Sequence, residues 1–173
     1  MTHPTLREAS SNRRTFAEQI VGFAIIALCS FAFAALAAIF FEQGSDWYSG
    51  LQKPAWSIDA SWAFLFFGSL HALFALSFWM IWRRNSLRIL KLELSIFLSG
   101  FLLEAIWSAS LYRIHQLLPS SIALVLWMCG AIVLSALFWK KNKLAGKILV
   151  LPLCWILYLV SINMMLCIAN NYP

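Results

Sequence analysis

The chain has 173 residues, of which 62% are hydrophobic and only 12% are charged. An ordinary soluble domain has roughly 25% charged residues, and a chain of this size could not bury so much apolar surface in water. The composition therefore excludes a soluble globular domain. It also excludes intrinsic disorder, which requires low hydrophobicity and high charge. The net charge of +6 comes from basic clusters between apolar runs, so a nucleic-acid partner is not expected.

Five segments are long and apolar enough to cross a lipid bilayer, which takes about 20 mostly apolar residues in a helix. They cover residues 19–41, 62–82, 92–112, 117–139 and 148–169. A backbone that faces lipid must satisfy its own hydrogen bonds, so each segment is predicted to be a helix. The sequence thus predicts one domain over 1–173, an all-α integral membrane protein built as a five-transmembrane-helix bundle.

The basic residues are divided unequally between the two sides that five spans define. Of the 13 Lys and Arg residues, Lys53 and Arg113 fall on one side and the other eleven fall on the side of the N-terminus. Cytoplasmic loops are enriched in Lys and Arg. We therefore predict a multi-pass protein of a bacterial inner membrane, with its N-terminus in the cytoplasm and its C-terminus outside.

The loop of residues 42–61, between the first two spans, is long for so compact a chain. It contains a cluster of aromatic and rigid residues, namely Trp47, Tyr48, Lys53, Pro54 and Trp56. Long loops with such content are often functional, so this loop is predicted to cover a ligand pocket. The alternative is that its aromatic side chains only sit at the level of the lipid headgroups.

Motifs in this loop and in the last span resemble those of a known family. The loop contains Trp47-Tyr48-x-x-Leu51-x-Lys53-Pro54-x-Trp56. This pattern resembles the signature of the translocator protein and tryptophan-rich sensory protein (TspO/MBR) family. Similar family patterns are matched by Trp107 in the third span and, in the fifth, by Trp155-x-x-Tyr158 followed by Ile162-Asn163.

The resemblance implies a compact bundle, often a homodimer, whose internal cavity opens toward the loop after the first helix. It implies ligands of the tetrapyrrole class, such as protoporphyrin and haem, or other flat hydrophobic molecules, with no required cofactor. A membrane receptor, sensor or carrier is the function we favour. The alternatives are a light-dependent porphyrin-degrading enzyme and a small regulatory membrane protein without a ligand.

Among the departures from the family pattern, three lie within the spans. Phe67 stands where the family has a tryptophan, His71 where a tyrosine is common, and Glu104 where an asparagine is usual. Photochemical degradation needs electron-rich aromatic groups beside the ligand, so Phe67 weakens the enzyme alternative. No catalytic set and no metal-ligand spacing is visible in the sequence.

Three polar residues within the spans are predicted to face the interior, because each would be costly against lipid. His71, Glu104 and Asn163 lie about 9 to 13 Å below the outer ends of their helices, which predicts one polar cluster beneath the loop. Glu104 could be a neutral acid bonded to neutral His71 or could form an ion pair with it, and either state would couple ligand affinity to pH. Iron ligation by His71 and a purely structural cluster are the other interpretations.

The remaining assignments follow from the same reasoning. Lys53 or Arg113 could pair with ligand carboxylates, and Glu93 is expected to pair with nearby basic residues or to extend toward the membrane surface. Small residues repeat every four positions from Ser30, which fits internal packing or a homodimer. The predicted ligand-binding residues are Trp47, Tyr48, Lys53, Pro54, Trp56, Phe67, His71, Glu104, Trp107, Trp155, Tyr158 and Asn163.

Overall fold

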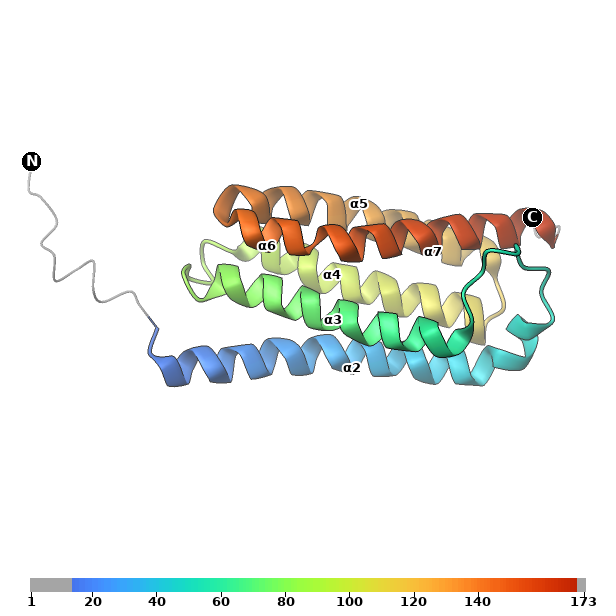
Figure 1. The fold of residues 1–173 in the computed structure, drawn as a ribbon, viewed down its shortest axis with the longest axis horizontal. Coiled ribbons are helices and arrows are strands. Elements are labelled where there is room, and N and C mark those ends of the chain that lie inside the picture. Colours follow the sequence, from blue (N-terminus) through green and yellow to red (C-terminus); the bar gives the residue numbers. More distant parts are fainter. Residues whose placement is uncertain (1–13, 171–173) are drawn as a thin grey trace, which may run out of the picture.

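The computed structural model describes residues 14–170 and, of residues 60, 61, 63 and 64, the backbone only. It confirms the all-α membrane architecture, because five of its helical segments are long and apolar enough to cross a bilayer. In chain order the elements are α2 (Phe16–Ser49), α3 (Ala60–Trp82), α4 (Lys91–Ser108), the π-helical turn η1 (Ala109–Arg113), α5 (Leu117–Lys141), α6 (Lys143–Ile148) and α7 (Val150–Ala169) (Figure 1).

The long helices run side by side, and each is antiparallel to the next along the chain (Figure 1). α2 packs against both α3 and α4, α4 packs against α5, α5 packs against α7, and α7 meets α3. The five spans therefore form a ring in the order α2, α4, α5, α7, α3. Among the described residues, no Cα of α3 lies within 8 Å of a Cα of α4, so only side chains bridge the space between these two helices.

The first helix is longer than the sequence predicted. It starts with a capping box, in which the Thr15 hydroxyl accepts from the Glu18 amide and the Glu18 carboxylate accepts from the Thr15 amide. It then continues to Ser49. The predicted loop of residues 42–61 was therefore wrong at its N-terminal boundary. The connection covers residues 50–59, and Trp47 and Tyr48 lie in the last helical turns.

Packing explains this extension of α2. Gly44 contacts the backbone of η1, and a Cβ atom built on it would lie only 1.9 Å from the Tyr112 carbonyl oxygen. The polar residues around Gly44 therefore remain part of α2, which packs closely against η1 at this point. α2 ends at Ser49 with Gly50 as its C-cap residue, and Pro54 follows four residues after Gly50.

The fifth span consists of two helices, α6 and α7, which meet at Leu149. Pro152 lacks the amide that would bond to the Ile148 carbonyl, and this accounts for the break. α6 returns closely beside the end of α5, because a Cβ atom on Gly146 would lie 2.7 Å from the Cα of Trp139.

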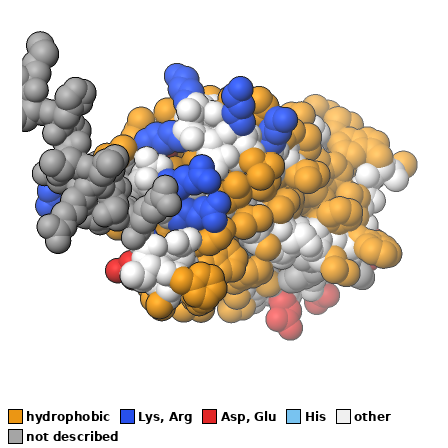
Figure 2. Space-filling model, turned by 60° about the vertical axis from the view of Figure 1, so that its left-hand side comes forward, with side chains coloured by type: hydrophobic (Ala, Val, Ile, Leu, Met, Phe, Trp, Pro, Cys, Tyr) orange, Lys and Arg blue, Asp and Glu red, His pale blue; other side chains and the backbone are white. Residues whose placement is uncertain are grey.

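The two ends of the bundle differ in charge. At one end α2 begins and short connections join α3 to α4 and α5 to α6, and Lys and Arg side chains gather there (Figure 2). The described basic residues of this basic end are Arg14, Arg83, Arg84, Arg88, Lys91, Lys140, Lys141, Lys143 and Lys147. Lys53 and Arg113 lie at the opposite end, the loop end, which also holds residues 50–59. Arg7 and Arg13 lie outside the described residues.

Candidate ligand-binding site

A buried polar chain links three helices in the middle of the bundle. The Ser30 hydroxyl of α2 lies 3.1 Å from Nδ1 of His71 on α3, and Nε2 of His71 lies 3.1 Å from Oε1 of Glu104 on α4. Their exposed fractions are 0%, 2% and 0%. The predicted contact between His71 and Glu104 is confirmed, whereas the role of Ser30 was not foreseen beyond its place in the small-residue repeat.

Asn163 does not join this chain, and the prediction of one shared cluster was wrong for it. Its amide donates to the hydroxyls of Ser120 and Ser121 on α5, at 2.7 and 2.8 Å. The reason is that Asn163 lies at a different depth in the bundle from His71 and Glu104. Tyr158 of α7 meets Ile58 just before α3 begins, so α7 extends beyond α3 at the loop end. Equal numbers of residues from two helix ends therefore do not give equal depth.

Three buried polar atoms have no hydrogen-bond partner among the described residues that surround this interior. They are Oε2 of Glu104 and the indole Nε1 atoms of Trp107 and Trp155. Buried polar atoms are almost always paired in native proteins. One acceptor and two donors thus remain unpaired, on residues that the sequence had already indicated as ligand-binding.

Aromatic side chains surround the unpaired carboxylate oxygen. The Phe67 ring lies 5.0 Å from the His71 ring and 6.3 Å from that of Trp107. On the other side, His71 stacks on Phe101 at 5.5 Å. These rings fill the space that the backbones of α3 and α4 leave open, and they present flat apolar surfaces there.

Open space lies beside the half-buried Gly68, on the loop-end side of His71. Gly68 lies two helical turns from Ala75 and on the same face of α3, and Ala75 is fully buried. A Cβ atom built on Gly68 nevertheless meets no atom within 4 Å. Gly68 is three residues from His71, and Trp107 is three residues from Glu104, so these pairs lie on the same helix faces.

A second aromatic group connects the loop with α7 and α3. Trp155 of α7 stacks on Phe66 at 5.6 Å and lies 5.1 Å from the ring of Tyr158. The half-exposed Trp56 of the loop contacts Tyr158 edge-on at 5.9 Å. The predicted residues Trp56, Tyr158 and Trp155 thus form a continuous aromatic path from the loop to Phe66 on α3.

The loop of residues 50–59 is attached along α7 by hydrogen bonds. The Ile58 amide donates to the Tyr158 hydroxyl at 2.8 Å, and Gln52 and Asn170 exchange two backbone–side-chain bonds of 2.9 and 3.1 Å. Within the loop, Pro54 begins a turn in which its carbonyl accepts from the Ser57 amide at 3.0 Å. The loop therefore follows α7 from its C-terminal end toward the middle of the bundle.

Three other predicted residues join α2 to its surroundings at the loop end. Trp47 stacks on His115 at 4.4 Å, and Tyr48 contacts Tyr112 at 5.3 Å. Lys53 donates to the Ser49 carbonyl and lies 4.9 Å from the Tyr48 ring. These contacts lie at the loop end, and none of them involves His71 or Glu104. His115 has a positive φ of 60°, a conformation that non-glycine residues adopt infrequently.

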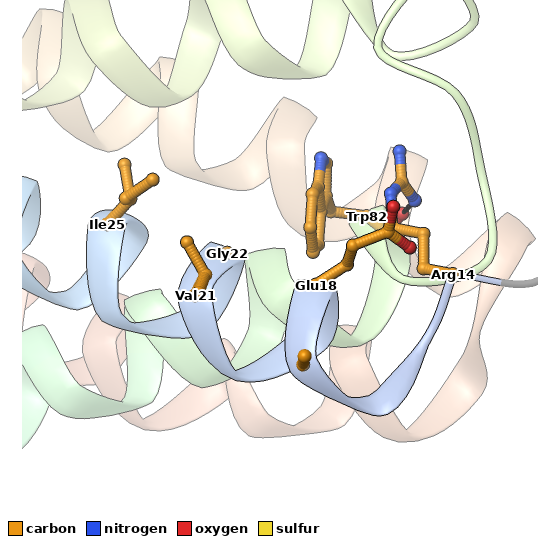
Figure 3. A pocket seen from close by; sticks show the side chains of 7 residues that line it. Arg14, Glu18, Val21, Gly22, Ile25 and Trp82 are labelled. Carbon is orange, nitrogen blue, oxygen red and sulfur yellow. Dashed lines mark hydrogen bonds between the residues drawn. The ribbon is translucent and has the colours of Figure 1, made fainter.

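An open hollow of about 440 Å³ lies at the basic end, between the start of α2 and Trp82 (Figure 3). The Trp82 ring lies against Gly22, where a Cβ atom would approach to 2.1 Å, and under the Arg14 guanidinium at 3.9 Å. Arg14 also donates to the carbonyls of Trp82 and Asn85, so this contact fastens α2 to α3.

The described residues contain no group of three or more His, Cys, Asp or Glu side chains that could hold a metal ion. Both ring nitrogens of His71 already have partners, Ser30 and Glu104. Iron ligation by His71 would therefore require one of these hydrogen bonds to break.

Taken together, the fold and the site define a small multi-pass membrane protein with an aromatic-lined interior beneath a loop attached to its last helix. The sequence model of the TspO/MBR family matches residues 23–168, and the chain belongs to this family. The chain is also similar to the uncharacterized membrane protein YtaB of Bacillus subtilis (strain 168). The two are 27% identical over 135 residues, which cover 78% of this chain and 86% of YtaB.

Proposed function

We propose that this TspO/MBR family protein is a membrane receptor, sensor or carrier that binds a tetrapyrrole or a similar flat hydrophobic ligand inside its helix bundle. The observation that carries the proposal is the set of three unpaired buried polar atoms, on Glu104, Trp107 and Trp155. They lie among stacked aromatic rings, and ligand sites typically combine apolar walls with a few polar groups that orient the ligand.

The loop supports an entry route at the loop end. Trp56, Tyr158 and Trp155 form the aromatic path described above, and the loop that carries Trp56 is held on α7 mainly by hydrogen bonds at exposed positions. We propose that residues 50–59 act as the lid of the pocket. We further propose that the basic end faces the cytoplasm of a bacterial cell, because eleven of the 13 basic residues belong to that side.

Absorbance titration of the purified protein with protoporphyrin tests the function directly. We expect saturable binding that Trp56→Ala weakens by about 1–3 kcal/mol, because the lid loses a large apolar ring that would bury its exposed half against the ligand. Trp139→Ala is the matched control, since Trp139 is an exposed tryptophan at the basic end of α5. Equal affinities of the wild type and of a folded Trp56→Ala variant would exclude the lid role of Trp56.

The same titration separates the alternatives. Loss of porphyrin absorbance that needs both light and protein would indicate the degrading enzyme, and Trp155 would be the first residue to replace. Stable, saturable binding without bleaching fits a receptor or carrier. Absence of binding would leave a regulatory protein without a ligand and would overturn the proposal.

A further inference from the structure

We infer that Glu104 makes the interior site selective for flat ligands that carry a cationic or N–H nitrogen, rather than for ligands that place an anionic group there. This inference rests on the proposed function, because it concerns the ligand of the same site. The inference concerns the chemical group of the ligand that contacts Glu104 on α4.

The first argument is the state of the carboxylate. Oε1 of Glu104 is 3.1 Å from His71, whereas Oε2 is buried and has no partner among the described residues. A carboxylate oxygen accepts hydrogen bonds, and leaving it unpaired in an apolar interior is unfavourable. A ligand that brings an N–H group to Oε2 removes this penalty, and a ligand carboxylate at the same place increases it.

The second argument is the distribution of charge. The described Lys and Arg residues all lie at the two ends of the bundle, and the middle of the spans holds only Glu104 and His71 as ionisable acid and base. His71 has both nitrogens engaged, by Ser30 and by Glu104 itself. Among the described residues, no Lys or Arg lies beside Glu104 to accept a ligand anion. Oε2 is a hydrogen-bond acceptor whether the proton of the His71–Glu104 contact is on Oε1 or on Nε2, so it complements a ligand N–H group.

The third argument is space. Gly68 and His71 of α3 face Glu104 and Trp107 of α4 where no Cα atoms of the two helices lie within 8 Å of each other, and a Cβ atom on Gly68 would meet no atom within 4 Å. The rings of Phe67 and Trp107 occupy the space between the two helices. A planar ring that enters from the loop end would take the place of the Phe67 ring and bring an edge nitrogen toward Oε2.

The test uses three flat three-ring probes of nearly equal size, namely cationic 9-aminoacridine, neutral 9-anthracenemethanol and anionic 9-anthracenecarboxylate. Their binding to the detergent-solubilised full chain is measured by fluorescence, with protein-free micelles as the background. We expect the cation to bind about ten- to a hundredfold more tightly than the anion, the range that a hydrogen bond to a charged group corresponds to. Glu104→Gln should abolish this preference.

A matched control and a second pair of variants separate an effect on probe preference from an effect on folding. Glu93→Gln removes the other buried carboxylate of α4, which pairs with Lys141 at the basic end, and it should leave the preference unchanged. If Glu104→Gln does not fold, Glu104→Asp and Glu104→Asn provide two side chains of equal length, of which only the first should keep the preference.

Equal binding of the three probes, tighter binding of the anion, or a preference that survives Glu104→Gln or Glu104→Asn would overturn the inference. Protoporphyrin titrated in the same micelles reports on the proposed function separately. Porphyrin binding without cation preference overturns the inference and leaves the proposed function standing. Cation preference without porphyrin binding supports the inference and overturns the tetrapyrrole assignment.

Discussion

Two buried carboxylates on α4 have opposite surroundings. Glu93, in the first turn, is 3% exposed, and its Oε1 lies 2.9 Å from Nζ of Lys141, which is about one quarter exposed. Glu104, eleven residues later and about 16 Å along the helix, is completely buried and bonds to a histidine. One of its oxygens has no partner among the described residues.

The difference separates a structural ion pair from a candidate binding group. Lys141 is partly exposed, so its ammonium group can reach the membrane surface while it pairs with Glu93. The pair therefore joins α4 to α5 near the basic end without burying an isolated charge. Glu104 is far from either end, and its partner is charged only when protonated. An intramembrane carboxylate in such surroundings is expected to serve function. Each prediction below tests this distinction.

The largest effect is expected from His71→Leu. This change leaves the Glu104 carboxylate buried without its only described partner, and breaking a buried pair in this way costs about 3–5 kcal/mol. Denaturation in detergent, followed by circular dichroism, measures the free energy of unfolding. The double variant His71→Leu/Glu104→Leu should recover most of the loss, because an apolar pair of similar volume leaves no buried charge. A loss below about 1 kcal/mol in the single variant would contradict the buried-pair interpretation.

Lys141→Met should have a smaller effect on the same measurement. The Glu93–Lys141 pair is partly exposed, so we expect a loss of about 1–2 kcal/mol, between the values for buried and exposed pairs. The charge-exchanged variant Glu93→Lys/Lys141→Glu should regain part of the stability. Protoporphyrin affinity should not change, and a clear change would show that the basic end communicates with the ligand site.

Ser30→Ala should have the smallest effect. It removes the contact of the Ser30 hydroxyl with Nδ1 of His71 and the bond that this hydroxyl donates to the His71 carbonyl, together worth about 1 kcal/mol. Ser99→Ala is the control, because Ser99 is an exposed serine of α4 that bonds only to the carbonyl of Ile96. If both serine variants were equally stable, the bond from Ser30 would contribute nothing to the orientation of His71.

The sequence by itself determined the membrane class, the five spans and the division of charge between the ends. These properties depend on local composition, because any stretch of about 20 apolar residues in lipid must form a helix. The contact between His71 and Glu104 also followed from the sequence, since two costly polar groups at similar depth share one interior. Of the tryptophans that the family motifs indicated, Trp107 lies beside that interior, with its ring 6.3 Å from the ring of Phe67.

Only the tertiary structure decided which elements meet. α2 extends to Ser49 because Gly44 packs on the backbone of η1, a contact between residues far apart in the chain. Asn163 bonds to the serines of α5 instead of Glu104 because α7 extends beyond α3 at the loop end. The unpaired oxygen of Glu104 likewise follows from the ring of helices, because whether a buried atom finds a partner depends on the three-dimensional packing around it.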